Sequence, residues 1–170
     1  VPYDTPVVGW RGSRVNTLRL WAGMPLDPIL LAAFNAGDHI GALRESNKAD
    51  SLSRVLYPAD ANVAGQGLRL RQENFFTTAS LQDIVQRHLS QYGDLHSLPD
   101  KAAIHLNDTH PAVAIAELMR LFMDLHEIDF DTAWDITKRT FAYTNHTLLP
   151  EALESWPVPL FERLLPRHMQ

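Results

Sequence analysis

Two short stretches in the second half of the chain decide the fold: residues 102–111 read AAIHLNDTHP, and residues 141–147 read FAYTNHT. Each stretch begins with an apolar run of strand length and continues into a polar run that contains Asn and His. A helical spacing of Ile115, Leu118 and Phe122 follows the first stretch. We therefore predict an α/β fold in which both polar loops leave the carboxyl ends of strands, where open α/β sheets bind their ligands.

The residues that follow each stretch predict further helices. Asp129 or Asp131 is a suitable N-cap for a helix that ends at about Arg139. After the second stretch, Leu149-Pro150-Glu151 is expected to begin another helix, because proline fits the first helical turn. The second half of the chain therefore alternates strands and helices.

The first half of the chain is less regular. Its patterns predict, in order, a strand near residues 14–21, a helix over 38–56 that ends at Pro58, a flexible loop over 58–67 and a long helix over 68–91. The helix over 38–56 has a polar centre between apolar ends, so it cannot pack one full face on its own core. We expect that helix to project toward solvent or into an interface.

The composition excludes several classes of protein. With 170 residues, 45% hydrophobic and 21% charged, the chain is globular and long enough for one domain. Its formal net charge of −5 argues against nucleic-acid binding, and no apolar run approaches the ~20 residues of a membrane helix. The lack of Cys excludes a disulfide scaffold, a thiolate zinc site and a Cys nucleophile. Neither end reads as a natural terminus, so we expect a segment of a longer protein.

The polar residues of the two loops allow three interpretations. His105, Asp108, His110 and His146 form a candidate His/Asp cluster for zinc or iron, although their spacing matches no metal motif. Alternatively, Asp108 and His146 act as a general acid–base pair. The third interpretation is structural, with Asp108 as a helix cap and His146 bonded to the backbone. Residue spacing does not choose among them.

The motifs together resemble those of the α-glucan phosphorylase family, which acts on glycogen, starch or maltodextrin. The resemblance is carried by NDTHP at residues 107–111, YTNHT at 143–147 and PEALE at 150–154. Further matches follow in the same order along the chain: PYDTP at 2–6, NTLRLW at 16–21, SRVLYP at 53–58 and LLPRH at 164–168. Since the family's polypeptide is several times longer, residues 1–170 are identified as an interior segment of its N-terminal domain, with 102–170 as the α/β part of the sugar site.

This resemblance implies a GT-B type glycosyltransferase fold, in which two Rossmann-like domains face each other across a cleft. The implied reaction is phosphorolysis of terminal α-1,4-glucosidic bonds of an α-1,4-glucan by inorganic phosphate, which gives α-D-glucose 1-phosphate with retention. The implied enzyme is a cytoplasmic homodimer with pyridoxal 5′-phosphate on a lysine of the C-terminal domain. No segment of this chain matches that lysine's motif, so the 170 residues alone are expected to be inactive.

The resemblance also assigns sugar-binding roles to the two loops. His146 matches the family histidine that hydrogen-bonds the glucosyl unit at the cleavage site, with its second ring nitrogen held by the backbone or by Asn145. Asp108 matches an acid that lines the same pocket and acts through water. Thr147 and His110 are expected to line the pocket more distantly.

Three features of the first half receive roles in the same way. Tyr57 matches an aromatic residue near the acceptor sugars. Residues 58–67 match a mobile gate over the site. Residues 38–56 match the tower-like helix that reaches the second subunit of the dimer, which accounts for the polar centre of that helix.

The chain departs from the family pattern at three places. In the gate, Asp60 is kept, but the second Asn that contacts sugar is Ala61 here, so that role is expected to pass to Asn62 or to be lost. Gln86-Arg87 replaces the two consecutive arginines of the AMP-regulated animal enzymes, which puts nucleotide activation in doubt. Ser155 stands where the family has Arg.

Two other functional classes remain open. The first is a non-catalytic fragment that binds carbohydrate or forms dimers. The second is a metal hydrolase that uses the four residues of the candidate His/Asp cluster.

Overall fold

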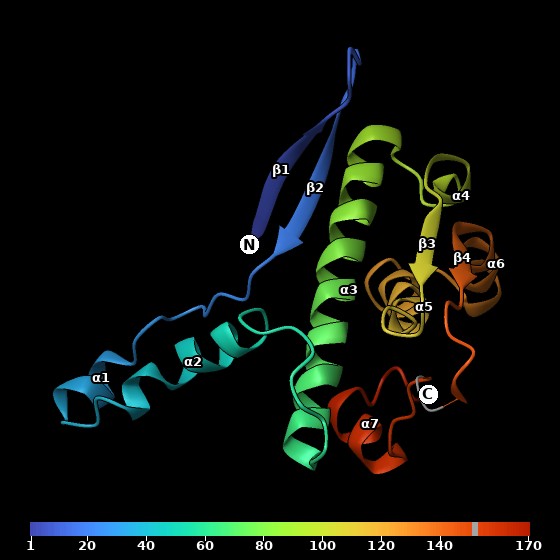
Figure 1. Cartoon of the computed structure of the whole chain (residues 1–170). Coiled ribbons are helices and arrows are strands. Elements are labelled where there is room, and N and C mark those ends of the chain that lie inside the picture. Colours follow the sequence, from blue (N-terminus) through green and yellow to red (C-terminus); the bar gives the residue numbers. More distant parts are fainter. Residues whose placement is uncertain (151–152) are drawn as a thin grey trace. The chain divides into compact units, whose positions relative to one another are not determined.

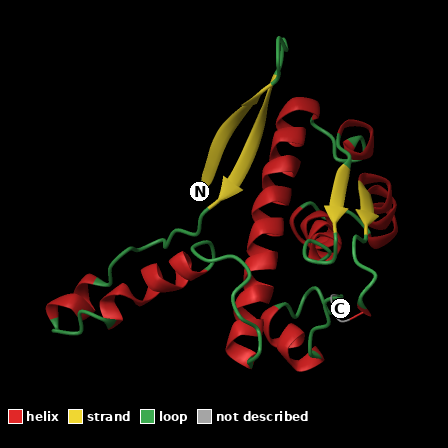
Figure 2. Ribbon diagram, in the orientation of Figure 1, coloured by secondary structure: helices red, strands yellow, loops and turns green. Residues whose placement is uncertain are grey.

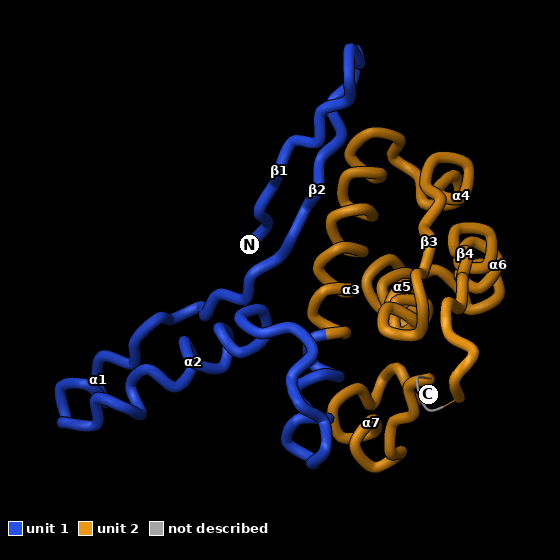
Figure 3. The backbone as a smooth tube through the Cα atoms, viewed as in Figure 1, with its two compact units in different colours: residues 1–72 blue, residues 73–170 orange. Residues whose placement is uncertain are grey.

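A computed structural model describes residues 1–150 and 153–170 of the chain. The chain divides into two compact units, residues 1–72 and residues 73–170 (Figure 3). The first unit contains one antiparallel hairpin and short helices, and the second contains a parallel strand pair surrounded by helices (Figure 1). The mixed α/β character predicted from the sequence is therefore confirmed.

The first unit begins with a β-hairpin. Strand β1 (Pro2–Val8) pairs antiparallel with β2 (Val15–Trp21), which confirms the strand predicted near residues 14–21. Asp4 and Arg19 face each other in the register, and the guanidinium donates two hydrogen bonds of 2.7 Å to the carboxylate. Such cross-strand pairs stabilise the register of a hairpin.

Three short helical segments follow the hairpin: α1 (Leu31–Asn35), the 3₁₀ turn η1 (Gly41–Leu43) and α2 (Arg44–Ser51). The helix predicted over residues 38–56 is therefore too long. It ends early because the backbone N–H groups of Leu52 and Ser53 donate three residues back, to Ala49 and Asp50, and so close a tightened last turn. None of the described residues Arg44–Ser51 is buried, which agrees with a helix that packs on no core of its own.

The long helix α3 (Val63–Tyr92) begins earlier than predicted and continues from the first unit into the second. Asn62 is its N-cap: the side-chain Oδ1 accepts a 2.9 Å hydrogen bond from the Gly65 N–H, and the Asn62 carbonyl accepts from the Gln66 N–H at 3.0 Å. Residues 63–67 are therefore helical rather than part of a loop. The prediction failed because a good cap outweighs the weak helix propensity of two glycines.

The second unit is built on two short parallel strands, β3 (Ile104–Asn107) and β4 (Phe141–Thr144), which lie side by side in Figure 2. Both strands occur where the sequence predicts them. The helices of this unit are α4 (Leu98–Lys101), α5 (Val113–Arg120) with the π-helical turn η2 (Leu121–Leu125), α6 (Phe130–Thr140) and α7 (Val158–Leu164).

Of the two helix starts predicted for this unit, one is confirmed and the other runs into residues that the structure does not describe. The Asp129 carboxylate accepts a 3.1 Å hydrogen bond from the Thr132 N–H, so Asp129 is the N-cap of α6, as expected. The helix expected from Leu149-Pro150-Glu151 extends into residues 151–152, which lie outside the described residues.

The hydrophobic core of the second unit lies between β3 and the helices. It is formed by buried residues of β3, α3, α4, α5, η2 and α6 and by Leu95, which precedes α4: Leu81, Val85, Leu98, Leu106, Ala114, Leu118, Leu121, Phe122, Ala133 and Ile136. On β3, Leu106 faces this core while His105 and Asn107 point to the opposite, exposed side, as strand alternation requires. No helix within residues 1–150 and 153–170 combines the length and the apolarity needed to cross a lipid bilayer.

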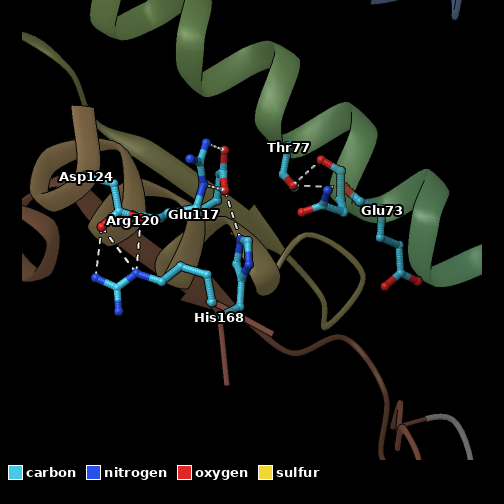
Figure 4. A network of polar contacts seen from close by, with 8 residues as sticks. Glu73, Thr77, Glu117, Arg120, Asp124 and His168 are labelled. Atoms are coloured by element: carbon cyan, nitrogen blue, oxygen red, sulfur yellow. Dashed lines mark hydrogen bonds and ion pairs between the residues drawn. The ribbon is translucent and has the colours of Figure 1, made fainter. Parts of the chain in front are cut away.

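One buried carboxylate in this unit fixes the end of the chain to α5. The Glu117 side chain is 1% exposed and accepts hydrogen bonds of 2.8 and 2.9 Å from Arg120 and one of 2.8 Å from His168 Nε2 (Figure 4). Nearby, Arg167 binds Asp124 at 2.8 Å and lowers the pKa of that carboxyl. Burial by itself raises the pKa of Glu117, but the hydrogen bonds from Arg120 and His168 outweigh it and lower the pKa from 4.5 to about 2.

This shift predicts a pH-dependent contribution to stability. Because the pKa of Glu117 is lower in the folded protein, its contribution of about 3 kcal/mol is complete above the unfolded pKa of 4.5 and is lost as the pH falls toward about 2. We expect Glu117→Gln to lower the free energy of unfolding by about that amount at pH 7, and by half or less at pH 3. Urea unfolding of the protein at both pH values measures the difference.

Glu162→Gln, on the exposed side of α7, is the matched control and should change stability little at either pH. An equal effect of Glu117→Gln at pH 7 and pH 3 would contradict the assigned charge state.

Candidate functional site

The two polar loops meet at one edge of the parallel strand pair. Asn107 and Thr144 are opposite each other in the register, and both are the last residues of their strands. The Asp108 N–H extends the ladder by one residue, since it donates to the Thr144 carbonyl at 2.9 Å. The predicted convergence of the loops at the carboxyl ends of the strands is confirmed.

Asp108 connects the first loop to the second. Its backbone has φ 67°, in the left-handed region that Asp and Asn enter more readily than other non-glycine residues. In this conformation Oδ1 accepts a 2.8 Å hydrogen bond from the backbone N–H of His146. The carboxylate thus holds the main chain of His146. Within the described residues it makes no hydrogen bond to the His146 ring, so the predicted acid–base pair is not formed.

The His146 ring is held by Asn107, whose Oδ1 accepts a short hydrogen bond from Nε2. The expectation that Asn145 or the backbone holds this ring is wrong. Asn145 Oδ1 instead accepts from the Thr147 N–H at 3.0 Å, and Thr147 Oγ1 accepts from the Leu149 N–H at 3.2 Å, so both side chains shape the loop itself.

Asn107 is a site residue that the sequence reasoning missed. It is the last residue of its strand and precedes the residue that holds the His146 main chain. The signal that finds it is the register: once β3 and β4 are aligned, Asn107 lies beside Thr144, two residues before the histidine.

The remaining polar residues near this edge have separate partners. The exposed His105 contacts Thr144 Oγ1 through Nε2 at 2.7 Å. His110 Nε2 lies 3.9 Å from Glu154 Oε1. Within residues 1–150 and 153–170, no three His, Asp or Glu side chains are placed to hold a metal ion.

In the first unit, the segment before α3 carries the other predicted sugar contacts. Tyr57 is exposed, has φ 51°, and has the Arg69 guanidinium 5.9 Å from its ring centroid. Asp60 forms a short ion pair with the same Arg69. Asn62 uses its side-chain oxygen to cap α3, so only its amide nitrogen could donate to a sugar.

This segment also passes very close to the first turn of α3. An ideal Cβ built at Gly65 would lie 1.9 Å from the carbonyl oxygen of Ala59, so only glycine allows that approach. Together with the Arg69 contact and the Asn62 cap, this close approach anchors residues 57–62 to α3.

None of the three lysines is suited to hold a covalently bound cofactor. All are exposed: Lys48 pairs with Glu45 at 2.8 Å, and the ammonium groups of Lys101 and Lys138 lie 5.4 and 5.9 Å from aromatic ring centroids. A lysine that forms such a link lies in a desolvated pocket.

The Asp108 contact gives a testable prediction. Asp108→Ala removes a hydrogen bond to a charged acceptor, worth about 1.5–3 kcal/mol, and leaves a β-carbon in the left-handed region. We expect the His146 amide to exchange with solvent deuterium about 10–100 times faster in this variant. Asp108→Asn keeps the acceptor oxygen and the tolerance of positive φ, so it should retain most of the protection. Equal exchange in the wild type and both variants would disprove the contact.

Comparisons with known proteins identify the family of this chain. The family model described as carbohydrate phosphorylase matches residues 1–170. The chain is 52% identical over 178 residues to the brain form of glycogen phosphorylase from Rattus norvegicus, and 53% identical over 178 residues to the muscle form from Homo sapiens. In both cases all of this chain is covered but only 21% of the relative, so the chain spans about a fifth of the length of these curated proteins. The chain belongs to the carbohydrate phosphorylase family.

Proposed function

We propose that this chain is a segment of an α-1,4-glucan phosphorylase, which cleaves terminal α-1,4-glucosidic bonds with inorganic phosphate and forms α-D-glucose 1-phosphate with retention. Family membership over the whole chain supports this proposal. The observation that carries it is the arrangement at the carboxyl edge of β3 and β4, where Asn107 and Asp108 hold His146 at its ring and at its main chain. The activity belongs to the full-length protein, because this chain covers about a fifth of its relatives.

The finer architecture is part of the same proposal. The parallel pair β3–β4 with its connecting helices would be one unit of a Rossmann-like N-terminal domain within a two-domain GT-B fold. A parallel pair with one face on the core and one exposed face is incomplete by itself, because parallel sheets are covered on both faces in nearly all proteins. Helices elsewhere in the full-length enzyme would cover the face that is exposed here.

Within this site, His146 would hydrogen-bond a hydroxyl of the glucosyl unit next to the scissile bond. A ring that is already held in place orients the sugar without losing rotamer freedom on binding. Asp108 fixes the position of the His146 main chain, and Thr147 and His110 line the pocket. Tyr57 and Asp60 would contact the acceptor part of the glucan, where an aromatic ring can stack on the apolar face of a sugar.

We further propose that the enzyme is a cytoplasmic homodimer that contains pyridoxal 5′-phosphate. The exposed, polar α2 is suited to an interface between subunits. The exposed lysines of this chain do not fit the cofactor, so its lysine would lie in another part of the enzyme. Bound there, the cofactor would supply a phosphate group that assists proton transfer to the substrate phosphate.

The activity itself is the first test. The full-length protein should produce glucose 1-phosphate from maltoheptaose and phosphate, and removal of pyridoxal phosphate should abolish the product until the cofactor is restored. A chelator should have no effect. Product formation that needs a metal ion would overturn the proposal, and a full-length protein that binds maltoheptaose without turnover would instead identify a non-catalytic carbohydrate-binding protein.

The role of His146 is tested by truncation of its ring. His146→Ala in the full-length enzyme should lower kcat/KM for phosphorolysis about tenfold or more, because a hydrogen bond of about 1–1.5 kcal/mol and the orientation it gives are both lost. His96→Ala is the matched control: its ring lies in the same unit, is exposed and contacts only Asp94 among the described side chains. Unchanged kcat/KM in His146→Ala would refute the assigned contact.

A further inference from the structure

We propose that Asn107 is a positioning residue that fixes the tautomer of His146, so that the ring presents an unprotonated Nδ1 and selects a sugar hydroxyl that donates its proton. This inference rests on the proposed function, since it takes His146 to be a sugar-binding residue. Asn107 belongs to the NDTHP motif at residues 107–111, but neither the family resemblance nor the acid–base interpretation gave it a role.

The argument begins with the chemistry of the two side chains. The side-chain oxygen of Asn107 has no proton and only accepts, so the short contact with His146 requires a proton on Nε2. A neutral imidazole carries one ring proton, and that proton is already on Nε2. Nδ1 therefore has a lone pair and is an acceptor.

Contacts of the backbone keep the His146 ring in the orientation that places Nε2 against Asn107. Asn107 is the last residue of β3, where it is fixed by the register opposite Thr144, and Asp108 holds the main-chain N–H of His146 at 2.8 Å. Two consecutive residues, the last of β3 and the first of the loop after it, thus bind one residue of the second loop at its ring and at its backbone. Rotation of the ring that turns Nε2 away from Asn107 would break that contact, although Asp108 would still hold the main chain of His146.

An acceptor at Nδ1 has a consequence for substrate choice. A hydroxyl can donate to Nδ1, whereas a fluorine in its place cannot, although the two substituents are similar in size. If Nδ1 carried the proton, the ring would donate and fluorine would be tolerated better. Discrimination between hydroxyl and fluorine at one position of the sugar therefore reports the tautomer of His146 during turnover.

The kinetic test uses the full-length enzyme in the direction of glucan synthesis. The donors are glucose 1-phosphate and its 3-, 4- and 6-deoxyfluoro analogues, and the measured quantity is the ratio of kcat/KM for each hydroxyl and fluoro pair. In Asn107→Asp a carboxylate faces the Nε2 proton and favours the doubly protonated ring, so Nδ1 becomes a donor. We expect the ratio for one analogue to fall about tenfold relative to wild type, with the other two unchanged.

Comparison of the same substrate pair in two enzymes cancels the effect of fluorine on the intrinsic reactivity of the sugar. Asn145→Asp is the matched charge control, because it adds the same charge at the residue next to His146 in the sequence while its oxygen still accepts from the Thr147 N–H. In that variant all three ratios should match wild type. A tenfold fall in Asn145→Asp as well would show a general charge effect and overturn the inference.

A second measurement needs no substrate. In full-length enzyme labelled with ¹⁵N-histidine, the His146 signals, assigned by their loss in His146→Ala, should show a protonated Nε2 and an unprotonated Nδ1. Asn107→Ala should give a mixture of tautomers. A protonated Nδ1 in wild type, or no change in Asn107→Ala, overturns the role of Asn107 even if His146→Ala lowers activity as proposed.

The two measurements separate the inference from the function on which it rests. If the tautomer is as proposed but no analogue shows a changed ratio, the selection of a donating hydroxyl is wrong. If the full-length protein makes no glucose 1-phosphate, the proposed function fails, and the tautomer measurement still decides whether Asn107 positions the ring.

Discussion

The parallel pairing of β3 with β4 is the constraint on which the site depends. Because the two strands run in the same direction, both of their carboxyl ends lie at one edge, and two loops separated by more than thirty residues of chain meet there. The pairing is only four residues long, so it needs support from outside the sheet. The core between β3, α3, α5 and α6 supplies that support through Leu106 and its buried neighbours.

The same edge shows how backbone strain and polar contacts are combined. Asp108 adopts a left-handed conformation that is unfavourable for most residues; its carboxylate binds the second loop at His146, and its N–H binds the end of β4 at Thr144. Asn107 adds a third contact through the histidine ring. The loops are therefore connected mainly by hydrogen bonds that are exposed in this chain, and such contacts become stronger where water is excluded.

In the second unit, a buried carboxylate with charged partners connects the helices. Glu117 is buried on α5, yet it is compensated by Arg120 and by His168, which follows α7, so that the end of the chain is attached to the core helix. A buried carboxylate without such partners would be strongly destabilising. In the first unit the comparable role belongs to the Asn62 cap and to the close approach of Gly65 to Ala59, which hold the segment before α3 against that helix.

Periodicity, caps and motifs are local properties of the chain, so they predict the order of strands, loops and helices, the two strand-end loops with their Asn and His residues, and the Asp129 cap, and the motifs carry the family resemblance. The three-dimensional fold adds that Asn107 rather than Asn145 holds the His146 ring, that Asp108 binds main chain rather than imidazole, and that residues 63–67 are helical. The first two contacts join residues 38 and 39 positions apart, and no local pattern specifies which donor reaches which acceptor until the register of the strands is set.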